Sequence, residues 1–177
     1  NAAFDLEFLN SELKSLGARA LEGVIIVDIL KMARRLLPGL ERYALWFVAE
    51  KLGIKEKQEH RALSDVELTL NVFNKLIQIM ESKGLFDFGI FTSLFSIDRV
   101  FLDSINEQKI ARIQEAIDLG LKLRIKYLSS SGAQVSEREV SPRQIKQEQN
   151  KSFLVGFCEL RKEERVFRID NILHLQL

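Results

Sequence analysis

Cysteine is almost absent from this sequence, since Cys158 is the single thiol among 177 residues. One thiol excludes an intrachain disulfide framework and a zinc cluster built on cysteines. We expect Cys158 to be a buried thiol in a reduced compartment.

Long apolar runs are also absent. No uninterrupted apolar stretch approaches the ~20 residues that a membrane-spanning helix requires. The first residues do not combine a basic segment with a following apolar one, as a secretion signal would. The sequence therefore predicts a cytoplasmic protein with no membrane partner.

Charge of one sign is not in excess, because 26 basic and 25 acidic side chains leave a net charge of +1. With this balance, the net charge alone does not indicate a nucleic-acid-binding protein. The distribution is uneven, however: residues 1–121 hold 15 basic and 18 acidic side chains, whereas residues 122–168 hold 11 basic and 6 acidic ones. With 46% hydrophobic residues, the chain can form one mid-sized domain or two small ones.

The segment from His60 to Asp65 carries the strongest local signal in the sequence. Ser64 and Glu67 have the spacing of a capping box, so a helix is predicted to begin there with Asp65 in its first turn. His60 and Asp65 would point about 140° apart on a continuous helix. They can therefore meet at one site only if His60 lies in the loop before the helix.

The run from His60 to Leu76, HRALSDVELTLNVFNKL, resembles the third motif, H-x4-D, of the DEDDh 3′ to 5′ exonucleases. The start of the chain, NAAFDLEFL, resembles the second motif of that family, N-x-x-F-D-x-x-F-L. Between them, the segment from Val24 to Ile54 follows the family's strand, helix and turn. The resemblance covers residues 1–83 and implies the C-terminal portion of an RNase H-like domain.

The first motif of the family, an Asp-x-Glu on the opening strand, would precede Asn1. We therefore expect the chain to be the C-terminal part of a longer protein, with an exonuclease domain that lacks its first strands. Helix surface without that sheet leaves apolar area exposed, at ~25 cal/mol per Å2. The chain alone is expected to be unstable and inactive.

The resemblance implies hydrolysis of phosphodiester bonds at DNA or RNA 3′ ends by two metal ions. Asp5 and Asp65 match two of the family's metal-binding carboxylates, and His60 matches the general base. Oxygen ligands without cysteine favour Mg2+ or Mn2+. Taken singly, Asp65 is more typical of a carboxylate that interacts with a helix dipole, and His60 of a surface loop residue. The order and spacing of two matched motifs together favour the exonuclease interpretation.

Residues 84–109 form a connector that is rich in phenylalanine. A flexible linker would be polar, so we expect this segment to dock on one of its neighbours and to contain the domain boundary. Its phenylalanines are Phe86, Phe88, Phe91, Phe95 and Phe101.

The last third of the chain changes to one helix followed by several strands. Apolar residues of Leu121–Tyr127 alternate with Lys122, Arg124 and Lys126, which predicts a strand with a basic outer face. A turn at residues 129–132 follows. Further strands are predicted at residues 136–146, 153–160, 165–169 and 172–177.

Three runs in this part, Val140-Ser-Pro142, Phe153-Leu-Val-Gly-Phe-Cys-Glu-Leu-Arg161 and Arg165-Val-Phe-Arg-Ile-Asp-Asn-Ile172, resemble a WYL domain. The resemblance covers residues 110–177 and implies a small SH3-like or Sm-like β-barrel that senses nucleic-acid or nucleotide ligands. The tryptophan that names the family is absent, and Asn171 stands where an arginine is common.

Two groups of basic residues are candidates for binding an oligonucleotide or nucleotide: Lys122, Arg124 and Lys126 on the first strand, and Arg161, Arg165 and Arg168 near a hairpin. Arginine binds phosphate in a bidentate manner. The alternative is a solvated sheet face, with Tyr127 and Phe167 in the barrel core.

The sequence therefore predicts a 3′ to 5′ exonuclease segment joined to a WYL-like ligand-binding barrel, in an α/β chain. The alternative is a non-catalytic nucleic-acid sensor whose exonuclease-like half is a remnant.

Overall fold

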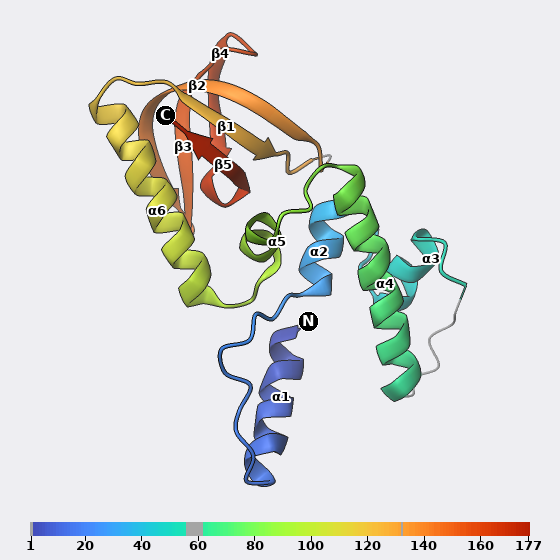
Figure 1. Ribbon diagram of the computed structural model, residues 1–177. Helices are drawn as coiled ribbons and strands as arrows, with labels where there is room; N and C mark the ends of the chain where they lie inside the picture. Colours follow the sequence, from blue (N-terminus) through green and yellow to red (C-terminus); the bar gives the residue numbers. More distant parts are fainter. Residues whose placement is uncertain (1, 56–61, 132) are drawn as a thin grey trace. The chain divides into compact units, whose positions relative to one another are not determined.

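The computed structural model describes residues 2–55, 62–131 and 133–177, and the chain divides into two compact units (Figure 1). The first unit ends at Asp98, and the second extends from Arg99 to Leu177. The fold is mixed α/β, with all five named strands in the second unit. Within the described residues, no helix combines the length and apolar character needed to cross a membrane.

The first unit is built around its longest helix. Its named helices are α1 (Ala2–Ser15), α2 (Ile29–Leu36), α3 (Leu45–Lys51), α4 (Ala62–Ser82) and α5 (Phe88–Phe95). Helices α2 and α3 pack on α4, and α5 packs on α2. The core side of α4 is a stripe of residues four apart, which puts them on one side of the helix: Leu68, Val72, Leu76 and Met80.

The stripe that is buried on α4 is narrower than the sequence predicts. Val66 and Leu70 belong to the apolar pattern of the helix, yet both are exposed. Helix α1 buries none of its residues, and Phe4, Phe8 and Leu9 are exposed on it. Apolar periodicity shows which surface a helix can bury, whereas burial itself depends on the elements packed beside it.

The start of α4 also differs from the expectation. The helix begins at Ala62, so Ser64 lies within its first turn instead of capping it. Asp65 is in the first turn, as predicted. The segment before the helix, residues 56–61, lies outside the described residues.

In the segment from Val24 to Ile54, which resembles the family's strand, helix and turn, the strand is reduced to a single antiparallel bridge between Val27 and Ser96. Two backbone hydrogen bonds flank it, from Asp28 N to Phe95 O at 3.0 Å and from Ile97 N to Ile26 O at 3.0 Å. In the described part of this unit no named strand lies alongside to extend the bridge into a ladder. The bridge joins the start of α2 to the end of α5.

The phenylalanine-rich connector contributes α5 to the first unit. Phe95 is fully buried, and the rings of Phe91 and Phe73 meet edge to face with centroids 6.3 Å apart. Phe91 also contacts Phe95 edge to face at 5.8 Å. These contacts dock α5 onto the helices before it.

The second unit is a helix beside an antiparallel sheet (Figure 1). Its elements are α6 (Arg99–Asp118), β1 (Leu123–Leu128), β2 (Val135–Glu148), β3 (Lys151–Cys158), β4 (Glu163–Arg168), the 3-10 turn Ile169–Asn171 and β5 (Ile172–Gln176). The strand order is β4-β3-β2-β1-β5. Helix α6 packs on β2 and places Ile113 and Ala116 in the core with Val140 and Leu154.

Alternation along β1 follows the prediction, because Leu123 and Ile125 are fully buried while Arg124 is exposed. Cys158 is a free, buried thiol, also as predicted. The register of β2 against β3 shifts between Pro142 and Gln144. Proline has no N–H to give to a ladder, so an irregularity is where a strand accommodates it.

Candidate functional sites

Asp65 is one of the two carboxylates that the sequence predicts to bind metal. It lies in the first turn of α4, and its Oδ1 atom is buried without a hydrogen-bond partner among the described residues. A buried carboxylate oxygen without a donor is destabilising. A hard cation or a proton donor would satisfy it.

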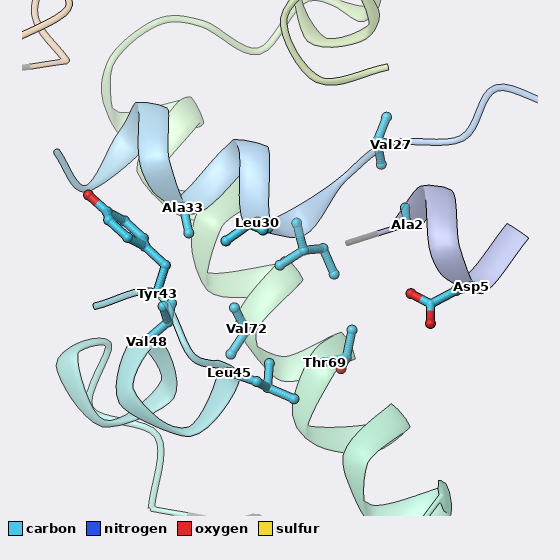
Figure 2. A pocket seen from close by; sticks show the side chains of 11 residues that line it. Ala2, Asp5, Val27, Leu30, Ala33, Tyr43, Leu45, Val48, Thr69 and Val72 are labelled. Atoms are coloured by element: carbon cyan, nitrogen blue, oxygen red, sulfur yellow. The ribbon is translucent and has the colours of Figure 1, made fainter. Parts of the chain in front are cut away.

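Asp5 lies on α1 and lines a hollow of about 530 Å3, which we call the apolar hollow (Figure 2). Most of the wall comes from aliphatic side chains of the α2–α4 region, including Leu30, Val48 and Val72. Thr69 of α4 lines the hollow as well. The carboxylate of Asp5 points from α1 toward Thr69 (Figure 2).

The spacing along α4 relates the two carboxylates. Asp65 precedes Thr69 by four residues, so the two side chains lie on the same side of the helix one turn apart. Asp5 and Thr69 both line the apolar hollow, whereas Asp65 is not among its lining residues. His60, the third residue predicted for this site, lies outside the described residues.

Asp5 and Asp65 are the two carboxylates that the sequence predicts to bind metal. Within residues 2–55, 62–131 and 133–177, no group of three or more histidine, cysteine, aspartate or glutamate side chains is placed to hold a metal ion. The donor set that is present consists of carboxylate oxygens, which suits Mg2+ or Mn2+. Asp65, with its unsatisfied oxygen, fits such an ion best.

Asp28 also follows an apolar run, but it has a structural role. Its side chain accepts a hydrogen bond from Leu30 N at 2.8 Å and caps the N-terminus of α2. An aspartate in this position satisfies a backbone donor that the helix leaves free.

In the second unit, the basic residues of the first strand lie among acidic ones. Lys122 forms ion pairs with Glu159 at 2.7 Å and Glu139 at 3.0 Å. The hydrogen bonds that Lys122 donates, first to Glu159 and then to Glu139, raise the pKa of Lys122. The hydrogen bonds that Glu159 accepts, first from Lys122 and then from Lys162, lower the pKa of Glu159 to about 2. Across the ladder, Arg124 stands opposite Glu139 and Lys126 opposite Glu137.

The second basic group is divided by the structure. Arg161 and Arg165 line a cavity of about 410 Å3, which we call the basic pocket. Arg168 forms a bidentate ion pair with Asp170 and does not line this pocket in the described structure. Of the six basic residues predicted for ligand binding, the structure brings Arg161 and Arg165 together at one cavity.

Arg138 is a third arginine of the basic pocket, and the sequence reasoning missed it. It stands directly opposite Ile125 in the β1–β2 ladder, and Ile125 is fully buried. Its Nε donates to Ser136 Oγ at 3.1 Å, while its Nη1 is buried without a partner among the described residues. The sequence could have indicated this position, because residues two apart in a strand face the same side and Arg138 is two residues before the core residue Val140.

Tyr127 and Phe167 form one wall of the basic pocket. Their rings meet edge to face with centroids 5.2 Å apart, and Phe167 is 5% exposed. The Tyr127 hydroxyl accepts a hydrogen bond from Arg168 N at 3.3 Å. Both rings are thus held by contacts within the unit.

Comparison with known proteins identifies both parts of the chain. The family model described as Exonuclease matches residues 1–73, and the WYL domain model matches residues 108–177. The chain therefore joins an exonuclease-family segment to a WYL domain, and both resemblances noted in the sequence are confirmed.

Individual relatives span much more than this chain. DNA polymerase III PolC-type of Staphylococcus aureus is 28% identical over 158 residues, which are 88% of this chain and 11% of the relative; the same protein of strains MW2 and USA300 matches equally. The chain thus spans about one ninth of these curated relatives. Among solved structures, proteasome accessory factor B/C (PafBC) of Arthrobacter aurescens matches with a TM-score of 0.39 and 20% identity, covering 75% of this chain and 19% of that one.

Proposed function

We propose that this chain, an exonuclease-family segment followed by a WYL domain, carries part of the active site of a 3′ to 5′ exonuclease that acts on DNA or RNA. The observation that supports this most directly is the buried, unpartnered Oδ1 of Asp65 at the start of α4. The match of residues 1–73 to the Exonuclease family supports it independently. The proposed fold of this part is RNase H-like.

The proposed roles follow from the side-chain chemistry. Asp5 and Asp65 hold divalent cations, and His60 takes a proton from the water that attacks the terminal phosphodiester, since its ordinary pKa of ~6.5 suits neutral pH. When two Mg2+ or Mn2+ ions are bound, they supply a more acidic water and stabilise the leaving oxygen.

The WYL domain is proposed to be an SH3-like or Sm-like barrel that binds an oligonucleotide or nucleotide. Arg161 and Arg165 at the basic pocket support this assignment. The proposed domain limits are residues 1–83 for the exonuclease segment, 84–109 for the docked connector and 110–177 for the barrel.

The test is a nuclease assay on the protein encoded by the complete gene, with a 5′-labelled strand and with Mg2+ or Mn2+. Asp65→Asn keeps the size of the side chain and removes its charge, so we expect 3′-end degradation to fall at least about 100-fold. Asp28→Asn is the matched control, because an asparagine still caps α2 and leaves the site unchanged. Equal degradation by the Asp65→Asn protein would refute the assigned role.

A non-catalytic nucleic-acid sensor is the second candidate. It is favoured by the basic pocket of the WYL domain, which Arg161 and Arg165 line. Under this alternative, the complete protein binds nucleic acid and shows no metal-dependent degradation with either the native sequence or the Asp65→Asn variant.

A further inference from the structure

The described residues that line the basic pocket include three arginines and no acidic residue. The arginines are Arg138, Arg161 and Arg165. Of the three, Arg165 also pairs with Glu163 at 2.8 Å, and Glu163 does not line the pocket. Three cations gathered around one concave site favour an anionic ligand.

Arg138 indicates where the anion sits. It occupies an inward position of β2 opposite Ile125, and its Nη1 is buried without a partner among the described residues. A buried guanidinium nitrogen without an acceptor is destabilising, whereas a phosphate oxygen would satisfy it in a charge-assisted bond. The planar guanidinium can also grip two phosphate oxygens at once.

Serine hydroxyls complete the polar wall. Ser129, Ser130, Ser131 and Ser136 line the pocket. Ser130 Oγ accepts a hydrogen bond from Asn171 Nδ2 at 2.9 Å, so its own hydroxyl hydrogen remains available to donate to a ligand. Asn171 thus holds the side chain of Ser130, a residue that lines the pocket.

The size of the pocket limits the ligand. Its 410 Å3 lies at the lower end of small-molecule sites, and Tyr127 and Phe167 add an apolar wall beside the polar one. One nucleotide, with its phosphate among the arginines and its sugar or base against the rings, matches this division. A phosphate monoester carries about −1.5 to −2 charge at neutral pH, more than the single charge of a diester, and so suits three arginines better.

We propose that the basic pocket binds a nucleoside 5′-monophosphate through its terminal phosphate. The link to the proposed function, on which this inference rests, is that exonucleolytic hydrolysis releases this class of product. Water adds its oxygen to phosphorus, the bond to the neighbouring 3′ oxygen breaks, and that oxygen leaves as the new 3′ hydroxyl. The pocket would then make the WYL domain a reader of the product.

The test is isothermal titration of the protein encoded by the complete gene, without divalent metal, with thymidine 5′-monophosphate, thymidine, inorganic phosphate and a thymidine dinucleotide without terminal phosphates. We expect the monophosphate to bind at least about 10-fold more tightly than thymidine and than the dinucleotide. Weaker binding of the monophosphate than of the dinucleotide, or none, would overturn the proposal. Equal binding of inorganic phosphate and the monophosphate would reduce the site to a phosphate site and overturn the nucleotide assignment.

Variants assign the binding to this pocket. Arg138→Met should weaken monophosphate binding at least about 10-fold, and Arg165→Gln, an exposed substitution that leaves the fold intact, should also weaken it. Arg143→Gln is the matched control, because Arg143 lies on the same strand as Arg138 but pairs with Glu164 outside the pocket. Loss of binding in the control, or full retention in both pocket variants, contradicts the assignment.

The binding experiment and the nuclease assay test different claims, and either can fail without the other. Monophosphate binding without nuclease activity in the complete protein would refute the exonuclease and the product link, while the pocket would remain a nucleotide site. Nuclease activity without monophosphate binding would refute the pocket alone.

Discussion

Gly156 packs directly against the backbone of Ser141, because a Cβ atom added at Gly156 would stand 2.6 Å from the Ser141 carbonyl oxygen. The same atom would meet a Val140 methyl at 2.7 Å. Gly156 pairs with Pro142 beside the register shift of β2, so the two strands approach closely where the ladder is irregular.

Gly156→Ala should therefore destabilise the second unit by about 1–3 kcal/mol, since backbone must shift to admit the methyl group. Amide hydrogen exchange of β2 and β3 measures the change. Lys151→Ala, at an exposed position of the same strand, is the control and should alter exchange little. Unchanged protection in the Gly156→Ala chain would contradict the close approach.

The phenylalanines of the connector differ in burial, and stability should follow that difference. Phe95→Ala removes a fully buried ring and should destabilise the first unit by about 3–5 kcal/mol. Phe88→Ala, on the same helix with its side chain 71% exposed, should change stability by less than about 0.5 kcal/mol. Fluorescence of Trp46, the single tryptophan and a residue of the first unit, reports both.

Asp28 caps α2, so its removal should cost stability without affecting chemistry. Asp28→Ala is expected to destabilise the first unit by about 0.5–2 kcal/mol. Asp28→Asn should recover most of the loss because it still accepts the hydrogen bond from Leu30 N. Denaturant titration followed at Trp46 compares the variants, and equal losses would argue against a capping role.

The ion pairs of Lys122 predict a measurable titration. Because the pKa of Glu159 is lowered to about 2, its ion pairs with Lys122 and Lys162 stabilise the fold above its ordinary value of 4.5, and this stabilisation is lost as the pH falls towards 2. The raised pKa of Lys122 has the opposite dependence, with stabilisation present below 10.5 and lost at higher pH.

Lys122→Met should raise the pKa of Glu159 towards its ordinary value, although Lys162 still holds it at 2.9 Å. Carbon-detected NMR of the glutamate carboxyl groups measures this shift directly. Arg143→Gln, which removes a different ion pair, should leave the titration of Glu159 unchanged. No change in the Lys122→Met chain would contradict the pairing.

Local signals in the sequence predicted local structure well. The residues around Ser64 predicted a helix with Asp65 in its first turn, and Asp65 lies in the first turn of α4. Alternation predicted the inward and outward residues of β1. In both cases the information lies within one element, in its spacing and its end signals.

Features that depend on residues distant in the sequence could not be predicted from local patterns. Residues 24–27 have a strand composition, but a ladder needs a neighbour, and the structure supplies a single bridge to Ser96. Arg138 gains its role from the register with Ile125 and from the loop at Ser129–Ser131, which neighbouring residues do not encode. The unsatisfied oxygen of Asp65 is likewise a property of the packed helices.

Strand β4 lies at one edge of the sheet, and it presents charged side chains at its start. Arg165 pairs with Glu163 at 2.8 Å, and Glu164 pairs with Arg143 at 2.7 Å. A strand from another molecule that approached this edge would have to desolvate these charges before it formed hydrogen bonds. The edge therefore discourages the growth of intermolecular sheets and protects the protein from aggregation at that side.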